Sequence, residues 1–536
     1  MCIRDRRNTT HFLNDKLTLD IGAQYIVQNN KNMVSQGQYY NPLPSLYLFP
    51  RGDNFDEIRL YERYNTNYGY MEQYWPYGDA SLSLQNPYWI QNRINRTSNK
   101  KRYMMNASLK WQATDWLNVV GRVNLDNSDY RNKNEKSAST LTTFCGVSGG
   151  FEDAMRQERS LYADFLANID KTFGDFHLTA NVGASIYHTS MDQLYIAGDL
   201  VIPNFFQINN INFSANYKPD PTGYEDEIQS IFASAELSWK NQLYLTVTGR
   251  NDWDSKLAFS KQKSFFYPSV GLSALLSEMV KLPEVISYAK IRGSYTVVAS
   301  SFDRFLTNPG YEYNSQTHNW ANPTVYPMDN MKPEKTKSWE IGLNLKFWGN
   351  RFNLDATYYR SNTLNQTFKV DIPSSSGYKQ AIVQAGNVQN QGIELALGFS
   401  DKWAGFGWSS NATFTLNRNK VKRLASGSVN PVTGEAIQMD EMNVGWLGKE
   451  NVAPRVILTE GGSMTDIYVY NQLTKDNNGN IKVDQNGNLG ITSSNTPVKV
   501  GNLDADFNLG WTNHFTYKGI DLGVVLSARV GLSLIH

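Results

Sequence analysis

Long apolar runs are missing from this chain of 536 residues. A membrane-spanning helix needs about twenty consecutive, mainly apolar side chains, and no stretch approaches that length. Transmembrane helices are therefore excluded. Strands that cross a membrane are not excluded, because each strand gives only every second side chain to lipid.

Cysteine, net charge and enzyme motifs are also scarce. Cys2 and Cys145 are the only thiols, and two cysteines so far apart predict no disulfide framework. The formal net charge of +1 gives no reason to expect a nucleic acid as partner. The 6 histidines have no metal-binding spacing, and no nucleophile elbow, P-loop or dinucleotide fingerprint occurs. The sequence predicts a protein that is not an enzyme and has no organic cofactor.

What the chain does have is a strict alternation of apolar and polar side chains. The clearest case places five apolar residues on one face of a strand, namely Trp339, Ile341, Leu343, Leu345 and Phe347. The residues between them are Glu340, Gly342, Asn344 and Lys346. A short turn at 349–351 leads into a second strand with the same alternation. A period of two over eight or more residues predicts a sheet that is apolar on one side and wet on the other.

Fifteen segments alternate in this way, and all but the first form close pairs. They are 17–27, 102–112 with 116–126, 159–170 with 176–188, 229–240 with 243–250, 267–276 with 289–298, 339–347 with 352–359, 391–400 with 407–417, and 505–517 with 519–529. The connections between the pairs are long: 28–101, 127–158, 189–228, 251–266, 299–334, 363–390 and 418–504. Short and long connections alternate along the chain, so the long loops fall at one end of the sheet. This asymmetry predicts an all-β protein, a transmembrane antiparallel β-barrel with short periplasmic turns and long extracellular loops.

The two ends of the chain lack this pattern. Residues 1–10 are basic and unpatterned, and no signal peptide precedes the first strand. Residues 531–536 stop just beyond a strand and end without an aromatic residue. Bacterial single-chain barrels have an even number of strands, whereas fifteen segments alternate here. We interpret residues 11–530 as part of a barrel, residues 1–10 as a start that need not be native, and residues 531–536 as a truncated end.

Six stretches of the chain carry a resemblance to a known family. They are 245–253 (LTVTGRNDW), 266–272 (FYPSVGL), 289–295 (AKIRGSY), 332–342 (KPEKTKSWEIG), 387–395 (NVQNQGIEL), and Gly501-Asn502 with 515–519 (FTYKG). Together they resemble the SusC/RagA family of TonB-dependent outer-membrane transporters. They occur in the family's order, each at a hairpin or strand start. Val298-Ala299 and Leu503-Asp504 depart from the family pattern, but both lie at loop entries.

The resemblance implies a fold and a set of partners. The fold would be a barrel of about 22 strands, of which this chain holds about fifteen, without the plug that fills the barrel. The parent would import oligosaccharides or oligopeptides across the outer membrane of a Bacteroidota-like bacterium. A SusD-like lipoprotein would cap the barrel, and the TonB–ExbB–ExbD complex would supply energy through an N-terminal region missing here. Lipid is the remaining expected partner.

Aromatic residues in the long loops are the candidate ligand contacts, because ring faces stack on sugars or hold peptide side chains. They are Trp75, Tyr77 and Trp89 in the first loop and Tyr311, Tyr313 and Trp320 in the fifth. The alternative is that these rings pack the loops together, and for any single residue the sequence favours this alternative.

Asp476 and Asp484 are the only metal candidates. Each begins a segment, Asp-Asn-Asn-Gly-Asn and Asp-Gln-Asn-Gly-Asn, that resembles a calcium loop with oxygen ligands and a turn glycine. Each copy has a single carboxylate, and Asn-Gly is also a strong hairpin signal. The hairpin interpretation is therefore favoured over calcium.

Two other classes of function remain open from the residues alone. One is a porin-like or adhesive outer-membrane barrel without a plug. The other is a secreted all-β glycan-binding protein, against which the one-sided loops count. A plug encoded upstream would separate an importer from an adhesin.

Overall fold

The computed structural model describes residues 2–213, 218–308, 310–314, 319–328, 331–425, 429–437, 439, 441–447 and 454–533. Its contacts divide the chain into two compact units. The first comprises Met1–Ala167, Gly183–Gln229 and Tyr311–Asn322, and the second comprises Asn168–Val182, Ser230–Gly310 and Pro323–His536. Strands β7 (Gly150–Phe173), β8 (Phe176–Asp199) and β9 (Lys218–Trp239) each contribute residues to both units.

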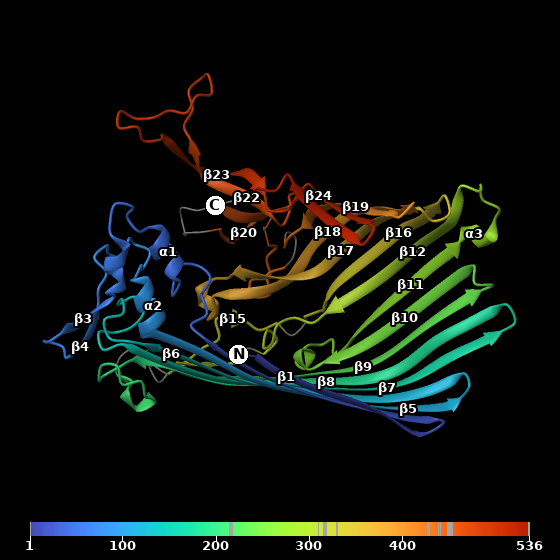
Figure 1. Ribbon diagram of the computed structural model, residues 1–536, viewed down its shortest axis with the longest axis horizontal. Coiled ribbons are helices and arrows are strands. Elements are labelled where there is room, and N and C mark those ends of the chain that lie inside the picture. Colours follow the sequence, from blue (N-terminus) through green and yellow to red (C-terminus); the bar gives the residue numbers. More distant parts are fainter. Residues whose placement is uncertain are drawn as a thin grey trace. The chain divides into compact units, whose positions relative to one another are not determined.

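The first unit contains four antiparallel neighbours in chain order. They are β1 (Cys2–Asn14), β2 (Leu17–Lys31), β5 (Ile94–Thr114) and β6 (Leu117–Lys136). In Figure 1 the blue strands β5 and β6 run side by side. Ile21 faces Ala107, and Ala107 faces Val123 on the next strand. One row of apolar side chains thus crosses three strands, as the alternation predicts.

The long connections of the first unit carry short elements. They are α1 (Pro42–Tyr47), η1 (Phe55–Arg59), β3 (Glu62–Asn65), β4 (Tyr70–Gln73), α2 (Pro87–Arg93), η2 (Ile208–Asn210), β13 (Glu312–Asn314) and β14 (Asn319–Ala321). Asn41 and Asn86 cap α1 and α2 through their side chains, and each is followed by a proline. A capping side chain before a proline is a strong helix start. No helix among the described residues has the length and apolar character needed to cross a membrane.

Among the described residues, nine strands of the second unit form a series in which each is antiparallel to the next. They are β10 (Leu243–Asp254), β11 (Phe265–Leu275), β12 (Ile286–Ser300), β16 (Glu334–Phe347), β17 (Phe352–Asp371), β18 (Gln380–Trp403), β19 (Phe406–Arg423), β24 (Phe507–Tyr517) and β25 (Ile520–Val530). The green strands β10, β11 and β12 lie side by side in Figure 1. Two of the turns, Ala404-Gly405 and Lys518-Gly519, have both residues at positive φ, as tight two-residue hairpins require.

Smaller elements complete the second unit. They are η3 (Ser255–Leu257), α3 (Leu276–Met279), β15 (Val325–Tyr326), η4 (Ser374–Ser376), β20 (Glu441–Trp446), β21 (Arg455–Thr459), β22 (Asp466–Leu473) and β23 (Ile491–Asn502). β15 pairs in parallel with β18, and β20 to β23 form a separate four-stranded sheet. Buried side chains that include Phe368, Val383 and Leu458 form an apolar core where β17, β18 and β21 meet.

The register of the second unit separates an apolar face from a polar face. One row runs across seven neighbouring strands as Ile291, Leu343, Ala356, Leu395, Phe414, Leu509 and Ala528. The adjacent row on the other face runs Arg292, Gly342, Thr357, Glu394, Thr415, Asn508 and Arg529. Large apolar side chains on the first face are exposed, for example Ile341 at 54% and Leu397 at 57%. Exposed apolar rows backed by polar rows are the pattern of a membrane barrel.

An aromatic belt marks the end of the apolar face near the short turns. Ring centroids are 5.2 Å apart for Trp348 and Phe352, 4.6 Å for Phe352 and Phe399, and 4.8 Å for Phe399 and Trp408. At the other end Trp339 and Tyr358 lie 5.4 Å apart. Aromatic residues at both borders of an apolar band are typical of the two interfaces of a membrane.

All fifteen predicted strands are present, but their bounds and number need correction. Within the unpatterned segment predicted at 1–10, the described residues 2–10 lie in β1, where Cys2–Asn14 pairs with β2. The strands are longer than predicted, so the connection predicted at 127–158 spans only 137–149 between β6 and β7. The connection at 363–390 likewise shrinks to 372–379. Beyond the membrane both faces of a strand meet water, and the alternation that marks it disappears.

Candidate functional site

An arginine on the polar face of the second unit reaches across a neighbouring strand. Nη2 of Arg292 on β12 donates to Oδ1 of Asp355 at 3.0 Å and to Oγ1 of Thr357 at 2.6 Å, both on β17. Nδ2 of Asn344, on the intervening β16, donates to Oδ2 of Asp355 at 3.0 Å. The carboxylate is thus held by charge-assisted bonds from two strands.

Gly342 makes this crossing possible. It lies between Arg292 and Thr357 in the register, and a Cβ atom there would be 2.6 Å from Nε of Arg292. Gly392 has the same role between Tyr359 and Asn417: the Tyr359 hydroxyl donates to Oδ1 of Asn417 at 3.1 Å and would lie 2.7 Å from a Cβ at position 392. Both glycines thus leave room for a neighbouring side chain.

The first unit holds a comparable pair on its polar face. Arg122 on β6 forms a two-pronged contact with Asp164 on β7, with Nε–Oδ1 at 2.9 Å and Nη2–Oδ2 at 2.6 Å. The Tyr162 hydroxyl donates to the same carboxylate at 2.8 Å. The Asp164 side chain is fully buried, whereas 46% of the Arg122 side chain is exposed. The alternation places Asp164 on the inner face, but sequence alone does not identify its arginine partner.

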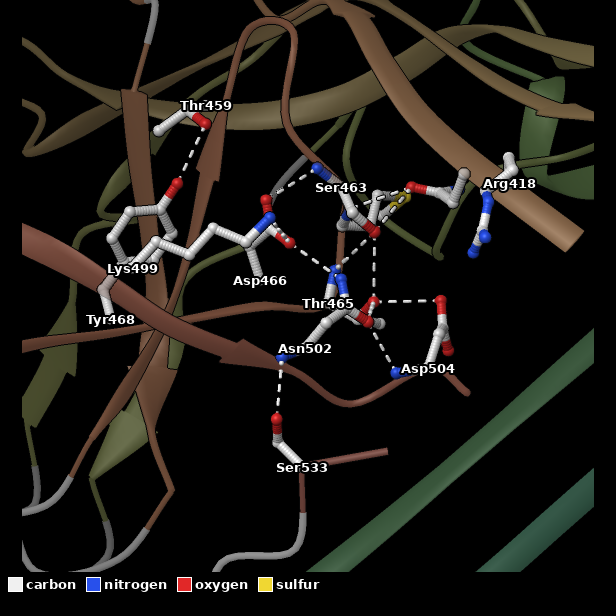
Figure 2. Close-up of polar contacts among 12 residues, drawn as sticks. Arg418, Thr459, Ser463, Thr465, Asp466, Tyr468, Lys499, Asn502, Asp504 and Ser533 are labelled. Carbon is white, nitrogen blue, oxygen red and sulfur yellow. Dashed lines mark hydrogen bonds and ion pairs between the residues drawn. The ribbon is translucent and has the colours of Figure 1, made fainter. Parts of the chain in front are cut away.

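The longest connection contains a buried carboxylate that sequence analysis missed. Asp466, 1% exposed, accepts from Nζ of Lys499 at 2.6 Å, Nδ2 of Asn502 at 2.7 Å and the backbone N–H of Ser463 at 3.0 Å. Figure 2 shows these groups converging on Asp466. The Thr465 hydroxyl lies 2.9 Å from both Oδ1 of Asn502 and Oδ2 of Asp504. These bonds connect β22 to β23 and to the segment that leads into β24. Asp466 and Lys499 are far apart in the sequence, so only the folded structure shows that they are in contact.

A polar pocket of about 590 Å³ opens beside this network. Its lining includes Arg360, Gln391, Arg418, Lys420 and Lys499. Nη1 of Arg418 donates to Oδ1 of Asp506 at 3.2 Å, and Arg418 is labelled at one side of the view in Figure 2. In all, five cationic side chains line the pocket, because Lys422 joins the four named above. Three anionic side chains also line it: Asp466, Asp504 and Asp506. The pocket can therefore accept an anionic group.

The predicted aromatic contacts of the first loop are packed to different extents. Trp89 on α2 is fully buried and donates from Nε1 to Oγ1 of Thr140 at 3.0 Å. It packs the loop, and its role in ligand binding stays a prediction. Trp75 and Tyr77 are half-buried, with ring centroids 5.0 Å apart, and Nε1 of Trp75 donates to the carbonyl of Gly78. Their ligand role stays a prediction.

The aromatic candidates of the fifth connection are open to solvent. Tyr313 and Trp320 face one another on the β13–β14 hairpin, with ring centroids 5.1 Å apart. The exposed fractions are 66% for Tyr311, 51% for Tyr313 and 66% for Trp320. The structure thus brings Tyr313 and Trp320 together, and their role in binding stays a prediction.

Asp476 and Asp484 cap the turns that they begin. Oδ1 of Asp476 accepts from the backbone N–H groups of Asn478 and Asn480, and Oδ2 accepts from Nδ2 of Asn480. Asp484 is bonded in the same way to Asn486 and Asn488. These bonds, the Asn480 side chain first, lower the pKa of Asp476, and those of Asn488 lower that of Asp484. Within the described ranges no three acidic, His or Cys side chains are grouped to hold a metal ion. The sequence favours a hairpin over calcium at both turns, and calcium binding would require these bonds to be replaced.

Comparison with known proteins identifies relatives of the chain. Residues 40–530 match the model of the family described as TonB dependent receptor-like, beta-barrel. TonB-dependent receptor P3 of Formosa agariphila is 23% identical over 430 residues, covering 74% of this chain and 41% of that protein. TonB-dependent receptor SusC of Bacteroides thetaiotaomicron is 26% identical over 320 residues, covering 56% of this chain and 31% of that protein. The chain thus spans less than half the length of these curated relatives.

A solved structure shares the fold. The RagAB peptide transporter superposes with a TM-score of 0.75 at 15% identity, covering 99% of this chain and 58% of the compared chain. At that identity the likeness concerns the fold. The predicted antiparallel β-barrel fold is thereby confirmed.

Proposed function

The chain belongs to the TonB-dependent receptor-like β-barrel family, and from this premise we propose that its parent protein imports a nutrient across the outer membrane. As a member of this family it is a multi-pass β-barrel protein of the outer membrane, related to SusC and RagA. Its matched relatives are receptors and transporters, which confirms the prediction that the protein is not an enzyme.

The proposal rests on the match to the family model, which covers residues 40–530. The matched residues include a sheet with one apolar face and one polar face. The apolar rows suit contact with lipid. The polar rows, with pairs such as Arg292 and Asp355, suit a water-filled interior that a plug and a ligand share. No strong binding chemistry is needed on this inner face, because a transported ligand must also leave it.

The proposal assigns the cargo to oligosaccharides or oligopeptides. Support for a peptide comes from RagAB, which is described as a peptide transporter. The exposed pair Tyr313 and Trp320 would contact the cargo, since aromatic faces bind either sugar rings or peptide side chains. A SusD-like lipoprotein would cap the barrel, and TonB–ExbB–ExbD would energise uptake.

The test is uptake by cells of the source bacterium. The gene of the full parent protein is deleted and restored in wild-type form or with Tyr313→Ala and Trp320→Ala together. Fluorescent oligopeptides and oligosaccharides are then supplied with and without a protonophore, which removes the energy that TonB transmits. We expect deletion and protonophore each to abolish uptake of one of the two cargo classes, and the double variant to weaken it. Uptake that ignores the protonophore would favour a porin-like barrel, and surface binding without uptake would favour an adhesin.

A further inference from the structure

A cluster of basic side chains lies on the lipid-facing side of the second unit, just beyond its apolar band. We call it the basic rim; it comprises Lys335 and Lys337 of β16, Arg360 of β17, and Arg418, Lys420 and Lys422 of β19. Arg360 follows Tyr358 by two residues, and Arg418 follows Leu416 by two. Because strand side chains alternate, Arg360 and Arg418 share the face of these apolar residues.

The register brings these cations into neighbouring rows. Arg360 is opposite Gln391, which is opposite Arg418, and Gln389 is opposite Lys420. On β16, Trp339 is opposite Arg360, and Lys337 is opposite Asn362. The outward positions of these rows on β16 to β19 carry no carboxylate: they are Lys335, Lys337, Arg360, Asn362, Gln389, Gln391, Arg418 and Lys420. The rows are therefore uniformly neutral or positive.

The basic rim lies at the depth of lipid headgroups. Along β17, eight residues separate Phe352, in the aromatic belt of the short turns, from Arg360. At about 3.4 Å per residue and a tilt of about 40°, this distance spans about 20 Å of membrane thickness, a few ångströms less than the apolar band of about 25 Å that is typical of such barrels, so the border itself is placed by the aromatic residues. Trp339 and Tyr358, whose rings are 5.4 Å apart, mark the same border. Arg360 and Arg418 therefore lie at the border where the apolar band ends.

The pocket of about 590 Å³ gathers part of the rim into a cavity. Arg360, Arg418, Lys420 and Lys422 are among its lining residues. Of the acidic residues in its wall, Asp466 is bonded to Lys499 and Asn502, and Asp506 accepts from Arg418. Asp504 accepts from the Thr465 hydroxyl, so all three carboxylates of the pocket already have partners. The five cations outnumber them, and the pocket can therefore accept an incoming anion.

We propose that the basic rim binds a phosphate-bearing lipid of the outer leaflet. The lipid phosphate would lie among Arg360, Arg418 and Lys420, and its acyl chains would run along the apolar row of Tyr358, Ile393 and Leu416 below. Continuity between cations and apolar band favours a lipid, since a free phosphate or an acidic protein would make no use of the band. The inference goes beyond import and uses only the orientation predicted from the sequence, with the long connections outside the cell.

The experiment is native mass spectrometry of the full parent protein, purified in mild detergent and titrated with phosphorylated lipid A. The variant Arg360→Gln/Arg418→Gln/Lys420→Gln removes three charges with little change in side-chain size. We expect its lipid affinity to fall about a hundredfold, at about fivefold for each basic residue near an anionic lipid surface. Dephosphorylated lipid A should bind the wild type as weakly as phosphorylated lipid A binds the variant.

A matched control removes three exposed lysines elsewhere in the same unit. Lys402→Gln/Lys475→Gln/Lys482→Gln, at a short turn and in the longest connection, should keep the wild-type affinity. Faster gel migration without heating confirms that each barrel is folded, and Lys337→Gln/Lys420→Gln replaces the triple variant if that variant fails to fold. Unchanged lipid binding by a folded rim variant would overturn the proposal, as would saturable binding of inorganic phosphate that is as tight as that of the lipid. Neither outcome depends on import, so the proposed function is tested separately.

Discussion

At the scale of single residues, a missing side chain at Gly342 decides how Arg292 reaches Asp355. The guanidinium passes over the glycine, where a methyl group would overlap it. We expect Gly342→Ala to destabilise the barrel by about 1–3 kcal/mol, the usual cost of overpacking a filled site. Urea unfolding followed by tryptophan fluorescence measures this change.

Gly293→Ala is the matched control for that substitution. Gly293 lies one strand away, and its added Cβ would only touch the Glu340 carbonyl at 3.6 Å. An alanine at 293 should therefore have a small effect. Equal destabilisation by the two alanines would mean that Gly342 is needed for strand flexibility and not for the crossing of Arg292.

The stability of the two turns that begin at Asp476 and Asp484 should depend on pH. Their turn bonds lower both carboxyl pKa values, so the stability that they give is complete above the unfolded pKa of about 3.9 and is lost as pH falls through the folded value. Hydrogen exchange of residues 474–490 should be slower in the wild type than in Asp476→Ala/Asp484→Ala at neutral pH. The difference between the two proteins should vanish in acid. A difference that persists at the lowest pH would assign the protection to other bonds.

Residue chemistry was only partly predictable from sequence. The inward position of Asp355 follows from alternation, but its partner Arg292 comes from a strand two places away in the sheet, and no spacing reveals that pairing. Trp89 and Trp320 are equally aromatic in the sequence, yet one is buried by the packing of its loop and the other is exposed. Exposure depends on tertiary packing, which local sequence does not encode.

At the scale of elements, the strand faces can be tested by placing a charge on each. Leu343 lies in the apolar row and Asn344 in the polar row beside Asp355. Leu343→Arg should destabilise the barrel by about 2–4 kcal/mol if it lies near the bilayer centre. Asn344→Arg should cost little, because the new cation meets a carboxylate and water. Folding into lipid vesicles measures both, and equal tolerance would contradict the assignment of the faces.

Strands were predictable where lipid constrains them and unpredictable elsewhere. The middle of β16 alternates strictly, and its predicted and observed positions agree. The outer part of β18, from Gln380, has no clear alternation and was predicted as loop. β1 escaped prediction because its arginine and threonine pairs break the period of two. The sheet of β20 to β23 was missed because its strands are short and interrupted by turns.

At the scale of the whole molecule, each unit pairs an apolar face with a polar one. This combination needs two solvents, lipid on one side and water on the other, and it explains why the chain is nearly all β yet has no long apolar run. The family match and the shared fold agree with that requirement. The import activity and the lipid site both depend on it.

The most direct measurement is spin-label accessibility at six consecutive positions of β17, 353–358, in the full parent protein in lipid. Cys2→Ser removes one thiol of this chain. Cys145 is buried, and burial raises the pKa of its thiol to about 12, so its background labelling is low. We predict that labels at 354, 356 and 358 are reached by oxygen from the lipid, and labels at 353, 355 and 357 by a water-soluble nickel complex. Accessibility that does not alternate, or that favours the nickel complex at all six positions, would contradict a membrane barrel.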